Sequence, residues 1–110
     1  FNLFLWASSA QAFHLCTDIR AVVVRGAEML IEGQEEVAID EMIAAQMQVH
    51  GHTHTPALRG AMLRQSLKLS RKIANNDLRQ KTAVNYFGDQ FHTDCTRNKI
   101  WSGIGHQRLE

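Results

Sequence analysis

A long uncharged start to the chain constrains the fold more than any other feature of the sequence. No Asp, Glu, Lys or Arg occurs between Phe1 and Thr17, and apolar side chains continue at helical spacing as far as Ile31. One narrow polar stripe interrupts them and consists of His14, Asp18, Arg25 and Glu32. A helix that is apolar almost all round is surrounded by protein. We therefore predict a long core helix from about Leu3 to Ile31.

Two alternatives apply to parts of this segment. Residues 1–12 resemble the apolar core of a signal peptide that ends at the small residues Ala10 and Ala12, although no basic stretch precedes them. A membrane span needs about 20 predominantly apolar residues, and polar residues dilute this run, so we predict no span. The β-branched run Val22–Val24 is the second alternative, because such runs favour strands.

Turn signals divide the rest of the chain into three further segments with helical apolar spacing. Gly33 ends the first helix, Gly51 occupies a C-terminal cap position, and Thr55 followed by Pro56 is a strong helix start. The predicted helices span about 34–49, 56–75 and 77–95, and the tail from about 96 is irregular. We predict an all-α fold, a small bundle of about four helices in a single domain that covers residues 1–110.

The spacing also predicts which side of each later helix is buried. In the second helix the predicted face consists of Ile39, Met42, Ile43, Gln46 and Val49. In the third helix one stripe holds Leu58, Met62, Leu69 and Ile73, and a second holds Leu63, Leu67 and Ala74. In the fourth helix the face consists of Ala83, Val84, Phe87, Phe91 and Cys95.

The length of the first helix favours a dimer. A helix over residues 3–31 is about 43 Å long, whereas a compact domain of about 100 residues has a radius of gyration near 13 Å. Three shorter helices cannot cover both the length and the circumference of such a rod. We therefore predict a homodimer that forms through the first helix, with two-fold symmetry as the commonest arrangement.

Charge is segregated along the chain although its total is only +1. Residues 28–41 contain six acidic residues and no basic one, and residues 59–81 contain seven basic residues and one acidic one. The bases Arg64, Lys68 and Arg71 share one face of the third helix, and Lys81 follows in the fourth. This face is either solvated, paired with the acidic segment of the same chain or a partner, or a contact for nucleic-acid phosphates.

The segment from Leu69 to Phe87 weakly resembles a helix-turn-helix motif. Ala74 and Val84 stand ten residues apart, like the buried small and β-branched positions of that motif. The resemblance implies that Gln80, Lys81 and Asn85 face a groove of the nucleic acid. Leu78 stands where the motif usually has glycine, and Arg79 where it has an apolar residue.

The alternating histidines His50, His52 and His54 are the most chemically suggestive motif. In extended chain they point to the same side, about 7 Å apart at Cα, and imidazole is a ligand for zinc-like divalent metals. Residues 51–56, read as Gly-His-Thr-His-Thr-Pro, resemble the late metal-binding motif of calcineurin-like metallophosphoesterases, while the other sequence blocks of that family do not occur. Further ligands of such a site would be His14, His92 or Asp40. The alternative is a polar loop between helices.

The two cysteines, Cys16 and Cys95, are too far apart in sequence for a redox or zinc motif. We interpret them as buried free thiols, because a reduced cysteine behaves as a small apolar residue. A single disulfide is the alternative if the protein is exported. The predicted location is the cytoplasm, with export possible if residues 1–12 are a signal remnant.

These observations leave three functional hypotheses, and none of them decides whether the chain is an enzyme. The first is a helical module that dimerises through its first helix and binds a protein or a small apolar ligand. The second is a metal- or histidine-dependent hydrolase or nuclease centred on His50, His52 and His54. The third is a nucleic-acid binder that uses Arg64, Lys68, Arg71 and Lys81.

Overall fold

The computed structural model describes the backbone of residues 2–51 and 55–97, and the side chains of these residues from Cys16 onward. Four α-helices and no strands make up this part of the chain, so the prediction of a small all-α bundle is confirmed. They are α1 (Asn2–Ile31), α2 (Glu36–Val49), α3 (Pro56–Ala74) and α4 (Gln80–Arg97). The segment Val22–Val24 lies within α1 and is helical.

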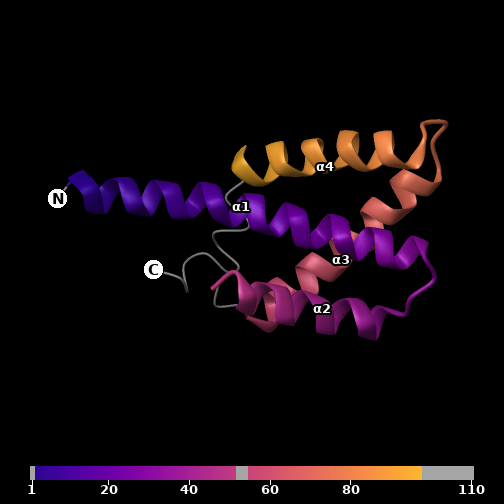
Figure 1. The fold of residues 1–110 in the computed structure, drawn as a ribbon, viewed down its shortest axis with the longest axis horizontal. Helices are drawn as coiled ribbons and strands as arrows, with labels where there is room; N and C mark the ends of the chain where they lie inside the picture. Colours follow the sequence, from indigo (N-terminus) through magenta and orange to yellow (C-terminus); the bar gives the residue numbers. More distant parts are fainter. Residues whose placement is uncertain (1, 52–54, 98–110) are drawn as a thin grey trace.

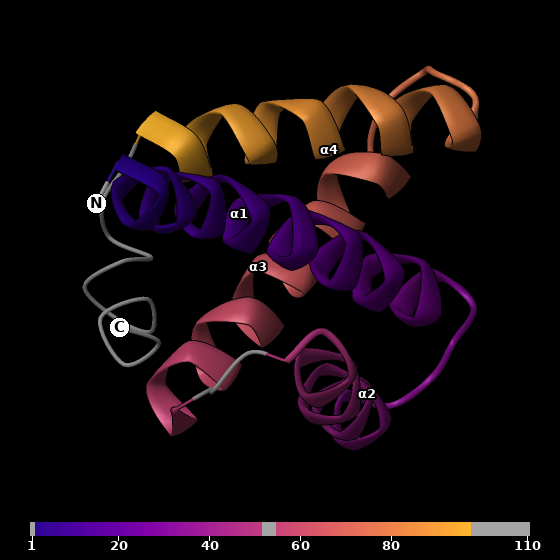
Figure 2. The same cartoon turned by 60° about the vertical axis from the view of Figure 1, so that its left-hand side comes forward.

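Helix α1 forms the axis around which the other helices are arranged (Figure 1). It contacts all three of them: α4 runs along one side, α2 lies on the other, and α3 crosses α1 obliquely between them (Figure 2). The 30 residues of α1 correspond to a rod of about 45 Å, close to the longest dimension of the molecule, 49 Å. The N-terminal half of α1 extends past the ends of the other three helices (Figure 1).

The core lies where α1, α2 and α3 meet. Its largest fully buried side chains come from all three helices and are Ile19, Val23, Ile39, Ile43, Met47, Leu58, Met62 and Ser66. Burial of apolar side chains of this size stabilises the fold by roughly 1.5–3 kcal/mol each. Ser66 is the one buried polar residue of the described chain, and its hydroxyl donates a hydrogen bond of 3.0 Å to the carbonyl oxygen of Val23.

The buried face of α2 differs from the predicted one. Ile39, Ile43 and Met47 are fully buried, whereas Gln46 is exposed and Val49 is 75% exposed. Residues four apart form a ridge that is inclined to the helix axis, and an obliquely crossing neighbour packs along such a ridge. The buried row therefore moves around the helix, and Val49 lies outside it.

The apolar stripes of α3 and α4 are largely as predicted. Leu58, Met62, Leu69 and Ile73 are buried in the core. In α4, Ala83 and Cys95 are buried, while Val84, Phe87 and Phe91 are partly buried against the core. The second predicted stripe of α3 is weaker, because Leu63 and Leu67 are only partly buried and Ala74 is exposed.

Capping residues explain where the helices begin and end. The Oγ1 of Thr55 accepts a hydrogen bond of 3.1 Å from the backbone N–H of Leu58, as its N-cap position predicts. Gly33 and Gly51 follow α1 and α2 with φ values of 93° and 77°, which favour glycine. Helix α2 begins at Glu36, two residues after the predicted start.

Helix α4 begins at Gln80 and not at the predicted Asp77. The side chain of Asn76 explains the delay. Its amide nitrogen donates to the carbonyl oxygens of Lys72 and Ile73 at 2.6 and 2.8 Å, and its oxygen accepts from the N–H of Leu78 at 2.7 Å. These bonds occupy free carbonyl oxygens at the end of α3 and stabilise a turn, so the next helix does not begin within it. Helix α4 ends at Arg97, two residues after the predicted end at about Cys95.

One side of α1 is open to solvent where its side chains are described. Thr17, Ala21 and Arg25 are exposed along this side between Cys16 and Ile31. In a single chain this side is not covered between Cys16 and Ile31, and its predicted cover by a second copy stays a prediction. The predicted core positions in residues 2–15 lie outside the described side chains.

Candidate functional site

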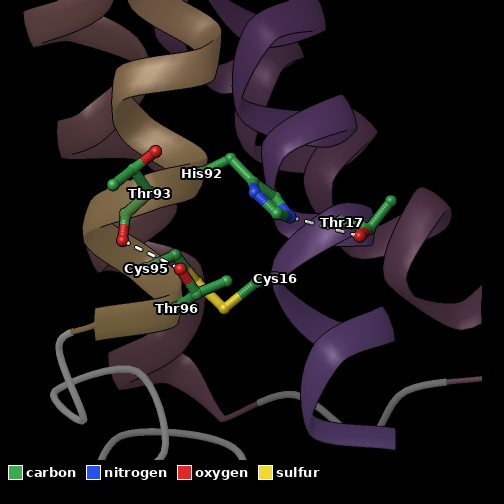
Figure 3. The surroundings of a disulfide bond; sticks show 6 residues. All are labelled: Cys16, Thr17, His92, Thr93, Cys95 and Thr96. Atoms are coloured by element: carbon green, nitrogen blue, oxygen red, sulfur yellow. Dashed lines mark hydrogen bonds between the residues drawn. A yellow bond between two sulfur atoms is a disulfide. The ribbon is translucent and has the colours of Figure 1, made fainter. Parts of the chain in front are cut away.

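A disulfide joins the middle of α1 to the end of α4 (Figure 3). The sulfur atoms of Cys16 and Cys95 are bonded, their Cα atoms lie 5.7 Å apart, and both residues are buried. The interpretation of these cysteines as free thiols is therefore wrong. Sequence separation gave no signal for the pairing, because it depends on α4 returning alongside α1.

The two residues that follow Cys16 contact histidines from two other helices. His92 of α4 lies 3.3 Å from the hydroxyl of Thr17, measured from its Nε2 (Figure 3). His50, the C-cap of α2, lies 3.7 Å from Asp18, measured from Nδ1 to Oδ1. We call residues 16–18 the α1 junction. It ties α1 to α4 and α2 at the point where the N-terminal half of α1 leaves the bundle.

The predicted metal ligands are not brought together by the described residues. His50 faces Asp18, His92 faces Thr17, and Asp40 accepts a hydrogen bond of 2.7 Å from Arg59. Within residues 16–51 and 55–97 no three His, Cys, Asp or Glu side chains are placed to share a metal ion. His52 and His54, and the side chain of His14, lie outside the described parts, so a zinc-like site with His50, His52 and His54 stays a prediction.

The predicted phosphate-contacting bases are all on the surface. Arg64, Lys68 and Arg71 are exposed along α3, and Lys81 is exposed in the first turn of α4. Among the described residues, none of these four has a carboxylate oxygen within 4.0 Å. A role in nucleic-acid binding stays a prediction. The helix-turn-helix resemblance is weakened, because Ala74, its small buried position, is exposed.

The acidic and basic segments are joined by one ion pair in the described chain. Arg59 of α3 binds Asp40 of α2 at 2.7 Å. A second acidic residue, Glu32, lies 3.6 Å from Arg25, which belongs to neither segment. Most of the charged side chains of the two segments are therefore exposed and have no ion-pair partner among the described residues.

A shallow cavity separates the last turns of α1 and α3. Its volume is about 290 Å³, and it is lined by Leu30, Ile31, Ser70, Arg71, Ala74 and Asn75. Its lining is mixed, with apolar residues from both helices beside the polar residues Ser70, Arg71 and Asn75. It holds none of the paired carboxylates or nucleophile–base pairs that hydrolytic chemistry requires.

No family model, no curated protein and no solved structure matches this chain. None of the helices, in the part of the chain that the structure describes, combines the length and the hydrophobicity needed to cross a membrane. Function therefore has to be argued from the surfaces of the bundle.

Proposed function

We propose that this chain is a helical interaction module that forms a homodimer through the N-terminal half of α1. The observation that carries the proposal is the extension of this half past the other three helices (Figure 1). Residues 2–17 of the extension contain no Asp, Glu, Lys or Arg. An uncharged helix that extends past the other described helices is stabilised when a second copy covers it.

The α1 junction supports this proposal because it fixes the base of the extension. The disulfide of Cys16 and the contacts of Thr17 and Asp18 hold α1 to α4 and α2 at one level. A helix held in this way is preorganised for packing, so less conformational entropy is lost when the dimer forms.

The disulfide also bears on location. Disulfides persist in oxidising compartments and are rare in the cytosol. We therefore propose that the protein acts in an oxidising compartment, which was the alternative to the cytoplasmic location. Labelling of the protein from its native source with a thiol reagent under denaturing conditions tests this point. No reactive thiol is expected before reduction, and two are expected after it.

The dimer is tested by sedimentation equilibrium on the full chain and on Leu5→Glu. The wild type is expected to be dimeric at micromolar concentration in 1 M salt, because salt screens charged contacts and does not weaken apolar ones. A carboxylate in the extension is costly to bury, so Leu5→Glu is expected to shift the equilibrium toward the monomer by tenfold or more. Ala21→Glu is the matched control, since Ala21 is an exposed residue of α1. A monomeric wild type, or equal effects of both variants, would contradict the proposal.

A further inference from the structure

We propose that one end of the bundle binds the same end of a second copy of this chain, through a surface separate from the N-terminal half of α1. Two connections lie at this end, opposite the N-terminus: residues 32–35 between α1 and α2, and residues 75–79 between α3 and α4 (Figure 1, Figure 2). We call it the turn end. Its surface carries an acidic part, a basic part and apolar side chains.

The acidic part surrounds the connection between α1 and α2. Glu35 and Glu36 are exposed there, and no ion pair involves either of them among the described residues. Glu28 precedes them in the last turn of α1, and Glu32 directly follows that helix. The sequence has no Lys or Arg between Gly26 and Leu58. Among the described residues Arg25 lies 3.6 Å from Glu32, and no ion pair involves Glu28, Glu35 or Glu36.

The basic part surrounds the connection between α3 and α4. Arg71 and Lys72 are exposed in the last turn of α3, and Arg79 and Lys81 are exposed at the start of α4. In the described chain none of these four lies within 4.0 Å of a carboxylate oxygen. Asp77 is the single acidic residue in this stretch.

Apolar surface lies at the same end. The cavity of about 290 Å³ between the last turns of α1 and α3 contains Leu30, Ile31 and Ala74 in its lining. Val37, in the first turn of α2, is 61% exposed, and Leu78, in the α3–α4 turn, is 46% exposed. These are two of the four large apolar side chains that are most exposed in the described chain.

A two-fold axis through the turn end would make this surface complementary to itself. In a two-fold contact each patch meets the corresponding patch of the partner, so the acidic part of one copy can face the basic part of the other, twice. Exposed ion pairs contribute little individually, and the apolar side chains at the same end supply the remaining contact. The expected contact is weak and sensitive to salt.

A second copy fits this end better than a nucleic acid does. Glu35 and Glu36 lie at the same end as the basic residues and would repel phosphates, and the net charge of the chain is only +1. A copy of this chain supplies acidic and basic groups in the arrangement that the surface requires.

Charge-swapped variants test the proposal by sedimentation velocity at low and high salt. Raising the salt from about 0.01 M to about 1 M shortens the screening length from about 30 Å to about 3 Å, so turn-end association should be present only at low salt. Glu35→Lys with Glu36→Lys, and Arg71→Glu with Lys72→Glu, each place like charges opposite one another. Each pair alone is expected to raise the Kd of the low-salt association by tenfold or more.

An equimolar mixture of the two swapped proteins is expected to recover the low-salt association as a mixed complex, because opposite charges then face each other again. Arg64→Glu with Lys68→Glu is the matched control, since it makes the same charge change farther from the turn end. Thermal unfolding shows that each variant is folded. The proposal is overturned if the wild type forms no larger species at low salt than at 1 M salt, if the mixture does not recover the low-salt association, or if the control pair weakens that association equally.

The result for the turn-end contact can be distinguished from the result for the α1 dimer. If both contacts form, the wild type is larger than a dimer at low salt and dimeric at 1 M salt. If only the turn end associates, the species are dimer at low salt and monomer at 1 M salt. A different result would assign this end to nucleic acid and overturn the proposal. In that case the chain shows no turn-end association but binds random duplex DNA in a salt-sensitive way, and Arg71→Glu with Lys72→Glu abolishes the binding.

Discussion

The Cβ atom that any other amino acid would add at Gly26 lies 2.5 Å from the hydroxyl oxygen of Ser66. Gly26 is buried in α1, and Ser66 is fully buried in α3. The hydrogen bond from Ser66 to the carbonyl oxygen of Val23 fixes the hydroxyl at this position. The two helices therefore cross with no space for a methyl group between them, and a small residue is needed on each side.

Gly26→Ala is expected to lower the free energy of unfolding. Alanine favours a helix over glycine by about 1 kcal/mol, but overpacking of a rigid core site costs typically about 1–3 kcal/mol. The added Cβ also lies 3.1 Å from a methyl carbon of Ile39, so it is crowded from two sides. We expect net destabilisation, measured by urea unfolding followed by circular dichroism.

Gly60→Ala is the control for this substitution. Gly60 also lies inside a helix, and the atom nearest to its added Cβ is a guanidinium nitrogen of Arg64 at 3.4 Å, the end of a flexible side chain. This variant is expected to gain roughly 0.5–1 kcal/mol from helix propensity. If both alanine variants change stability in the same direction, the close crossing at Gly26 is not what decides the outcome.

Removal of the disulfide is expected to cost about 4 kcal/mol. The cysteines are 79 positions apart, and the stabilisation from closing a loop rises slowly with its length. Cys16→Ala with Cys95→Ala should unfold at a lower denaturant concentration than the oxidised wild type. A reducing agent should shift the wild type toward the variant and leave the variant unchanged. Identical unfolding of the oxidised wild type and the variant would contradict the structure.

The ion pair of Arg20 with Asp89 is expected to matter less than the packing of Arg20. The two side chains are 2.9 Å apart, but that of Asp89 is 77% exposed, and exposed pairs contribute about 0–1 kcal/mol. Arg20 also packs over Gly88, where an added Cβ would lie 3.1 Å from its guanidinium. We expect Arg20→Ala to lower the melting temperature more than Asp89→Asn, and Arg20→Met to fall between them, because Met retains an unbranched apolar chain.

Thr55→Ala is expected to destabilise the protein by about 1 kcal/mol, because the Oγ1 of Thr55 accepts the N–H of Leu58 at the start of α3. Thr55→Ser keeps the accepting oxygen and should retain most of that stability. The free energies of unfolding of the two variants, measured in the same denaturant, give the comparison. Equal losses would show that the methyl group of Thr55, and not its cap, is important.

The number and order of the helices could be predicted because their signals are local. Thr55 and Pro56 start a helix, Gly33 and Gly51 adopt positive φ values after one, and Leu58, Met62, Leu69 and Ile73 recur at helical spacing. The errors depend on tertiary contacts. Whether Met47 or Val49 is buried depends on the angle at which neighbouring helices cross α2. This angle cannot be predicted from the apolar spacing within one segment.

The candidate sites were harder to predict for a related reason. The pairing of Cys16 with Cys95 and the contact of His50 with Asp18 depend on which helices are neighbours. The Gly26–Ser66 crossing likewise has no signature in either segment alone. The segregation of charge was visible in the sequence. Its pairing was not, and among the described residues only Arg59 and Asp40 join the acidic segment to the basic one.

The bond between Cys16 and Cys95 makes the core of this protein a covalently closed ring, because it encloses all three connections between the helices. A protease that cuts one of these connections therefore releases nothing. The two pieces remain one molecule of unchanged mass, apart from the added water, until the bond is reduced. Proteolytic damage to the middle of the chain would in this way be hidden from any separation by size carried out without a reductant.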